Sequence, residues 1–267
     1  MYRIVALVSV VLVVVCVAFR ASAASADGAP ARALPVGERG VVAAIVDGDT
    51  LVLESGTEVR LVGIQAPKIP LGRAGFVAWP LGDEARAALG DLVLGRAVAL
   101  HYGGRQMDRH GRALAHVVRE DGVWVQAMLL GAGFARVYSF PDNRALVANM
   151  LDHEAAARRA GRGIWADDFY RIQSPESVAR LLNTFQLVEG RVVSAAVVRG
   201  RAYLNFGADW RSDFTATVSP RDRRVFDDEG YDLKLLEGRT IRVRGWIKSF
   251  NGPMIEVTHP EQVEVFD

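Results

Sequence analysis

The stretch Gly40-Val-Val-Ala-Ala-Ile-Val-Asp-Gly-Asp-Thr-Leu-Val-Leu53 decides the fold of the N-terminal part of the chain. Two apolar runs flank Asp47-Gly48-Asp49, and Asp-Gly between apolar runs is among the strongest short signals for a β-hairpin. Residues 58–64 read as a third strand, and residues 97–102 and 113–119 as two further short strands. We therefore expect a small β-structure that opens with this hairpin.

Three segments between and after these strands have helical spacing: residues 83–94, 125–137 and 143–160. The last is followed by Gly161-Arg-Gly163, which is typical of a helix C-terminus. Short strands with interspersed helices favour a mainly β, α+β fold in which a small barrel carries three helices, and not a parallel βαβ sheet.

A second strand-rich block occupies residues 186–267, after a polar linker over residues 171–185. Residues 188–198 and 202–206 predict one hairpin, residues 214–218 a single strand, and residues 240–249 and 254–257 a hairpin around Asn251-Gly252. Residues 44–51 can be laid over residues 196–203, as if each opened a five-stranded barrel. Chance similarity between two apolar hairpins explains this echo equally well.

Composition excludes several classes of protein. The 267 residues are 50% hydrophobic and 24% charged, which excludes a disordered or low-complexity chain. A net charge of +1 excludes a protein that coats nucleic acid through bulk positive charge, so such binding needs a local patch. The one cysteine, Cys16, excludes an intramolecular disulfide and a cysteine-based zinc cluster.

The N-terminus has the features of an export signal. A positive start at Met1-Tyr-Arg3 precedes an apolar run over residues 4–19, and Ala21-Ser-Ala23 supplies a cleavage site. We predict a signal peptide over residues 1–23, a flexible lead-in over residues 24–36, and a mature chain without a membrane span. The protein is then periplasmic or secreted; an uncleaved N-terminal membrane anchor is the alternative.

Three short motifs occur in a specific order: Asp47-Gly-Asp-Thr50, Arg60-Leu-Val-Gly-Ile-Gln-Ala-Pro67 and Asp108-Arg-His-Gly-Arg112. Together they resemble the staphylococcal-nuclease-like, or thermonuclease, family. The resemblance covers residues 40–170 and implies a domain over residues 37–170 with a five-stranded oligonucleotide-binding (OB) barrel and three helices. Residues 186–267 would then form a second, small OB-like barrel. Active members of the family are Ca²⁺-dependent phosphodiesterases that act on DNA and RNA.

The resemblance also assigns roles to individual residues. Asp49 falls on the first metal carboxylate, with Asp47 supporting it, and the backbone carbonyl of Ala66 falls where it reaches the metal. Arg60 and Arg112 fall on two arginines that clamp phosphate oxygens, a task suited to the planar guanidinium.

Two positions depart from the family pattern: Gln65 stands at the second metal carboxylate, and Lys68 at the general-base glutamate. The site is therefore three charge units more positive. An ammonium about 5 Å from a divalent ion repels it by roughly 6–7 kcal/mol at an effective dielectric constant of about 20. A millimolar Ca²⁺ site is worth only about 4 kcal/mol. We therefore expect no retained Ca²⁺ and no other cofactor.

A lysine base is the alternative use of Lys68, but it requires a neutral amine, and Asp47 and Asp49 favour the charged form instead. The sequence then predicts a phosphate-binding site formed by Arg60, Lys68 and Arg112.

Three functions stay open. The first is binding of nucleic acid, a nucleotide or another phosphate-bearing ligand with weak or absent hydrolysis. The second is an active secreted or periplasmic nuclease. The third is an envelope interaction module that keeps only the fold; a pair of unpaired arginines at residues 60 and 112 would argue against it.

Arginines in the second block offer a further candidate surface. If strand alternation gathers several on one face they form a basic patch beside aromatic side chains, and ordinary packing is the alternative. The residues concerned are Arg191, Arg199, Arg201, Arg242 and Arg244, with Tyr203, Phe206, Trp210 and Trp246.

Overall fold

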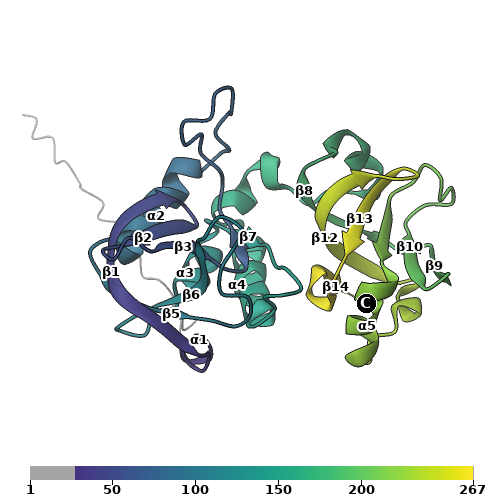
Figure 1. Cartoon of the computed structure of the whole chain (residues 1–267). Coiled ribbons are helices and arrows are strands. Elements are labelled where there is room, and N and C mark those ends of the chain that lie inside the picture. The colour runs from purple at the N-terminus through teal and green to yellow at the C-terminus, as the bar shows by residue number, and fades with distance from the viewer. Residues whose placement is uncertain (1–27, 267) are drawn as a thin grey trace, which may run out of the picture.

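The computed structural model describes residues 28–266, which form two halves (Figure 1). Each half has its own hydrophobic core. The predicted signal peptide and Cys16 lie outside the described residues. Across residues 28–266, no helix combines the length and apolar character that crossing a membrane requires.

The first half is a closed five-stranded barrel with the order β1-β2-β3-β6-β5. All neighbours in the ring are antiparallel except β3 and β6. The strands are β1 (Val36–Asp47), β2 (Thr50–Leu53), β3 (Glu58–Leu61), β5 (Ala97–His101) and β6 (Ala113–Arg119), and a separate two-stranded pair joins β4 (Ile64–Gln65) to β7 (Arg136–Val137).

The expected three helices are present as α2 (Gly82–Val93), α3 (Val125–Ala132) and α4 (Val147–Arg159). The prediction of a helix over residues 125–137 was wrong at its C-terminal end, because the helix stops before Gly133. That residue has φ +77°, and a Cβ there would lie 2.1 Å from the Arg162 carbonyl oxygen. The chain therefore turns at Gly133, and residues 136 and 137 become strand β7.

The lead-in predicted as flexible is ordered from Gly28 onward, while residues 24–27 lie outside the described part. The Gly28 amide donates to the Gly122 carbonyl at 2.8 Å, and the short helix α1 (Ala29–Arg32) buries Ala31 completely. Burial of one apolar side chain and a backbone hydrogen bond hold this segment on the barrel.

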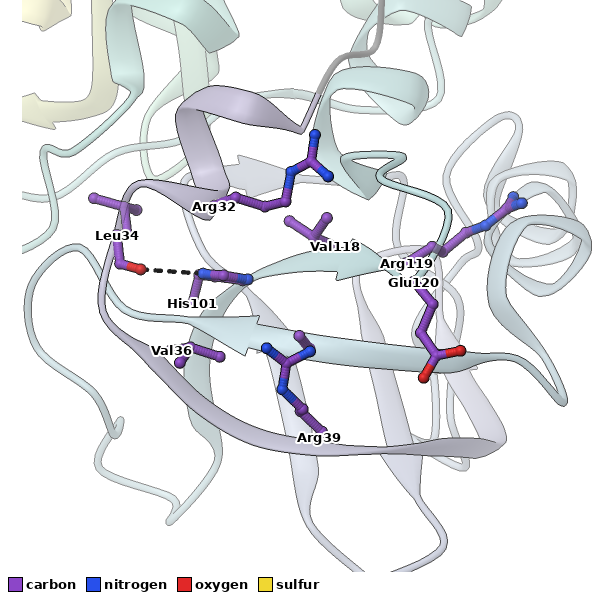
Figure 2. A pocket seen from close by; sticks show the side chains of 9 residues that line it. Arg32, Leu34, Val36, Arg39, His101, Val118, Arg119 and Glu120 are labelled. Carbon is purple, nitrogen blue, oxygen red and sulfur yellow. Dashed lines mark hydrogen bonds between the residues drawn. The ribbon is translucent and has the colours of Figure 1, made fainter.

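A hollow of about 390 Å³ lies between this docked segment and strands β5 and β6 (Figure 2). Arg32, Arg39 and Arg119 line it, together with His101, whose Nδ1 is 3.2 Å from the Leu34 carbonyl oxygen. The hollow lies toward the N-terminal end of β1. Asp47 lies at the opposite end of the same strand, so the hollow is separate from the turn that follows Asp47.

The second half is a seven-stranded sheet with the order β14-β12-β13-β11-β10-β9, and β8 pairs with β12. Its strands are β8 (Phe185–Arg191), β9 (Ser194–Val198), β10 (Arg201–Asn205), β11 (Thr215–Val218), β12 (Thr240–Ser249), β13 (Pro253–Val257) and β14 (Val263–Val265). Helix α5 (Pro220–Asp228) and the short 3₁₀ helices η4 (Leu233–Leu236) and η5 (Pro260–Gln262) join them.

The two sheets share one connectivity. If β8 and β9 are taken as one bent strand, the path β9-β10-β11-β13-β12-β8 repeats the ring order of the first half. The parallel pair β11 and β13 matches the parallel pair β3 and β6. The overlaid hairpins therefore hold the same place in both halves, but the second turn is Arg199-Gly200, one position earlier than the overlay of residues 196–203 requires.

Residues 163–181 connect the halves through 3₁₀ helices η1 (Gly163–Ala166), η2 (Asp168–Tyr170) and η3 (Pro175–Leu181). Val178 of η3 is fully buried in the second core. The Gln173 backbone amide donates to the Leu187 carbonyl of β8, and the Gln173 carbonyl accepts from the Glu189 amide. The segment predicted as a linker is thus packed on the second half.

A buried ion network joins the two halves. Arg244 of β12 is 1% exposed and donates to Glu154 of α4 at 2.9 and 3.0 Å. Glu264 of β14 accepts from Arg244 at 2.6 Å and from Arg158 at 2.7 Å. Because Glu154 is fully buried, these pairs tie the orientation of one half to the other.

Candidate functional site: the acidic turn and its cations

The turn between β1 and β2 presents two buried carboxylates, Asp47 and Asp49. The Asp49 amide donates to Asp47 Oδ1 at 3.1 Å, which fixes the turn. Gly48 is required between them, because a Cβ there would lie 2.7 Å from the Ala66 Cβ and 2.8 Å from the Ala85 Cβ. The turn therefore packs tightly against the loop that follows β4.

That loop brings Lys68 onto the turn. Its Nζ lies 2.8 Å from Oδ1 and 2.7 Å from Oδ2 of Asp49, and 3.3 Å from Oδ2 of Asp47. The Ala66 amide also donates to Asp49 Oδ2 at 2.7 Å. The observed contact of Ala66 is thus its N–H on the carboxylate, whereas the expectation concerned its carbonyl on a metal.

Arg60 completes the cluster from β3. Its Nη2 is 3.2 Å from Asp49 Oδ2 and donates to the Ile64 carbonyl at 2.6 Å, while Nη1 donates to the Leu61 carbonyl. Burial by itself raises the pKa of Asp49, but the charges of Arg60 and Lys68 outweigh it and lower the pKa to about 2. The carboxylate is therefore fully ionised at neutral pH and neutralised by two cations.

Gln65 points away from this cluster toward Arg136 of β7. Its Oε1 accepts from Arg136 Nε at 2.9 Å and from Nη2 at 2.7 Å. Sequence reasoning did not identify Arg136, because the residue fell inside the segment predicted as helix. Its position on a strand beside β4 brings it to Gln65.

Arg112 stands apart from the cluster. Its Nη2 lies 2.7 Å from Asp108 Oδ2, and its Nη1 is 4.0 Å from Glu58, beyond hydrogen-bond distance. Within residues 28–266 its side chain makes no hydrogen bond or ion pair with Asp49, Arg60 or Lys68. Both arginines thus have acidic partners, so their presence does not weigh against an interaction module that keeps only the fold.

Metal-binding groups are sparse in the described part of the chain. Within residues 28–266, no three His, Cys, Asp or Glu side chains gather where they could hold one ion. Asp47 and Asp49 form a two-carboxylate pair whose oxygens already contact Lys68.

Comparison with known proteins identifies the family. The model of the staphylococcal nuclease homologue family matches residues 58–167. An uncharacterized endonuclease of Escherichia coli O157:H7 is 34% identical over 131 residues, covering 48% of this chain and 77% of the relative. This chain belongs to the staphylococcal nuclease family.

Two further relatives of this chain carry nuclease names. A micrococcal nuclease of Shigella flexneri is 33% identical over 140 residues, covering 48% of this chain and 74% of the relative. Endonuclease YhcR of Bacillus subtilis is 29% identical over 146 residues, covering 51% of this chain and 12% of the relative. The matched residues 58–167 include Arg60, Gln65, Lys68 and Arg112.

The second half does not present the suggested basic patch as a unit. Arg242 and Arg244 are buried in the ion network, and Phe206 lies in the core. Trp210 and Trp246 remain 51% and 44% exposed. Packing and ion pairing therefore account for Arg242, Arg244 and Phe206, three of the residues of the suggested patch.

Ser139 has a histidine partner that the sequence did not indicate. Its Oγ is 2.7 Å from Nε2 of the fully buried His259, whose Nδ1 is 2.9 Å from the Thr258 hydroxyl. A hydroxyl in place of a carboxylate behind the imidazole does not make a catalytic triad. We assign this pair to the contact between the halves.

Proposed function

We propose that this chain is an exported family member that binds nucleic acid or another phosphate-bearing ligand without a metal ion, with weak or absent hydrolysis. The Lys68 ammonium on both carboxylate oxygens of Asp49 carries the proposal. It stands where the family resemblance implies Ca²⁺. Export rests on the sequence of residues 1–23, and an OB-like second barrel rests on the shared connectivity of the two sheets.

The donor set supports this reading, because it does not fit Ca²⁺. That ion takes about six to eight oxygen ligands, commonly including several carboxylates. Here the Asp49 oxygens face Lys68, Arg60 and the Ala66 amide, and the Gln65 oxygen faces Arg136. We therefore assign no catalytic step to a metal ion.

Two partly exposed cations, Lys68 in the cluster and Arg112 apart from it, are available to a phosphate. The Lys68 side chain is 22% exposed and the Arg112 side chain 28%, and Arg112 Nη1 has no acceptor within hydrogen-bond distance among residues 28–266. Asp47, Asp49, Asp108 and Glu58 offset much of the positive charge, so we expect weak and strongly salt-dependent binding.

Binding of a labelled oligothymidylate, measured by fluorescence anisotropy in EDTA and in Ca²⁺, tests the proposal on residues 24–267. We expect the same affinity in both buffers. Arg112→Ala should weaken binding by about 1.5–3 kcal/mol. Lys68→Ala should weaken it as well, while the exposed Lys234→Ala serves as the matched control.

The same experiment separates the alternatives. Strong Ca²⁺-dependent cleavage by the unaltered protein would establish the active nuclease that the relatives' names suggest. Absence of binding and of cleavage would favour the interaction module.

A further inference from the structure

A cavity of about 370 Å³ lies where the two halves meet. Its volume falls within the roughly 300–1,000 Å³ usual for small-molecule sites. Trp79, Arg136 and Phe169 of the first half line it opposite Phe185 and Trp246 of the second. Neither half alone completes it.

Arg136 is a buried cation without an acidic partner among the described residues, which indicates a site for an anionic ligand. The residue is 6% exposed, and within residues 28–266 no carboxylate lies at ion-pair distance from it. Nε and Nη2 donate to Gln65, which leaves Nη1 of the guanidinium without a protein acceptor among the described residues. Buried charges are normally paired, so this cation is suited to an anion that enters the cavity.

Burial lowers the pKa of Arg136 to about 10, so the guanidinium remains charged at neutral pH. Two rings hold it in place: its Cζ lies 4.7 Å from the centre of the Phe185 ring and 5.8 Å from that of Trp79. The group is thus a fixed cation rather than a mobile surface side chain.

The rim of the cavity adds flat apolar surface and positive charge. Phe169 is 50% exposed and Trp246 44%, and such ring faces stack well on nucleic-acid bases. Arg171 and Arg180 also line the cavity, against one acidic side chain, Asp168. Aromatic faces beside an excess of guanidinium groups match a ligand that joins a planar base to a phosphate.

We propose that this interdomain pocket binds a nucleotide, with its phosphate at Arg136 and its base against the exposed rings. The site goes beyond the proposed function, because none of its lining residues belongs to the cluster of Asp47, Asp49, Arg60 and Lys68. The ligand is either a free mononucleotide or the phosphorylated end of a strand.

Hydrogen bonds connect the pocket to the cluster of Asp47, Asp49, Arg60 and Lys68. The Trp79 amide donates to the Lys68 carbonyl at 2.8 Å, and Gln65 holds Arg136 from the other side. A strand end in the pocket would therefore lie beside the surface that we propose binds the phosphate backbone.

Calorimetry and tryptophan fluorescence with dTMP, thymidine and inorganic phosphate, all in EDTA, test the pocket on the purified protein. We expect dTMP to bind about tenfold or more tightly than thymidine or phosphate, because it alone uses both the rings and the cation. Arg136→Gln should weaken dTMP binding by about tenfold or more, and the exposed Arg180→Ala by about fivefold. Arg211→Ala, an arginine stacked on Trp210 outside the pocket, should leave the affinity unchanged.

The outcomes are distinct. No saturable dTMP binding would overturn the pocket, and so would equal binding of dTMP and phosphate. Loss of dTMP binding in Lys68→Ala with retention in Arg180→Ala would move the nucleotide to the acidic cluster and leave the proposed function intact. A 5′-phosphorylated oligothymidylate that loses affinity in Arg136→Gln, when the unphosphorylated strand does not, would identify a strand end as the ligand.

Discussion

Changing Lys68 to Glu, alone and together with Gln65→Asp, should create Ca²⁺ binding at Asp49. The Lys68 Nζ lies 2.7 Å from Asp49 Oδ2. A Ca²⁺ ion on that oxygen would sit about 2.4 Å from it, so ion and ammonium would be at most about 5 Å apart. At an effective dielectric constant of about 20 their repulsion is roughly 6–7 kcal/mol or more, which exceeds the roughly 4 kcal/mol of a millimolar site.

The Gln65 position should respond less. Arg136 donates to Oε1 of Gln65 at 2.7 and 2.9 Å, so the carboxylate that Gln65→Asp introduces would be paired with that guanidinium. Aspartate is also one methylene shorter. We therefore expect Gln65→Asp alone to bind almost no Ca²⁺, Lys68→Glu to bind it measurably, and the double variant to bind most tightly.

Calorimetric Ca²⁺ titration and a cleavage assay on single-stranded DNA measure this order in the unaltered protein, both single variants and the double. Lys234→Glu provides the same change in net charge at an exposed position of η4. Tighter Ca²⁺ binding by Gln65→Asp than by Lys68→Glu would refute the role given to Arg136. A folded double variant without Ca²⁺ affinity would refute the view that these two positions account for the loss of the site.

Three further predictions concern other parts of the molecule. Arg244→Met should lower the free energy of unfolding, measured in urea, by about 3–5 kcal/mol, because Glu154 stays buried with fewer partners. The exposed Arg221→Met is the control. A loss below about 1 kcal/mol in Arg244→Met would contradict a stabilising role for the ion network. Burial lowers the pKa of both His116 and His259 to about 4, against about 6.5 when unfolded, so stability should be full above pH 6.5 and fall by up to about 3 kcal/mol per histidine toward pH 4. Equal unfolding free energies at pH 7 and pH 4 would show that neither imidazole is held neutral. Mass measurement of the protein from the envelope fraction should place the new N-terminus near Ala24, and an intact Met1 on a membrane-bound product would support the anchor instead.

Local sequence predicted those parts of the fold that depend on near neighbours. The Asp-Gly turn predicted the hairpin of β1 and β2, because its two strands are adjacent in the chain. The limit of α3 was missed, because helical spacing continues past Gly133. The left-handed conformation of Gly133 ends the helix, and the nearby Arg162 carbonyl leaves no room for a side chain there.

The candidate site shows the same difference between contacts that the sequence predicted and contacts that it did not. Lys68 was expected near Asp49, since the motif fixes both positions, and the structure places its ammonium on that carboxylate. The Arg136 contact with Gln65 spans 71 positions, and the Arg244 contact with Glu154 spans 90. Contacts between residues so far apart in the chain produce no periodic pattern in a single sequence, so the sequence alone did not predict them.

The ion network between the halves has a consequence for the order in which the molecule is completed during synthesis. Chains emerge N-terminus first, so the first barrel can form while β12 and β14 are still unmade. Until then Glu154 has Arg158 but neither Arg244 nor the Glu264 that links both arginines. The last strand thus acts as a closing step: a chain that ends before residue 264 can pair Arg244 with Glu154, but it lacks the carboxylate that also joins Arg158 to Arg244.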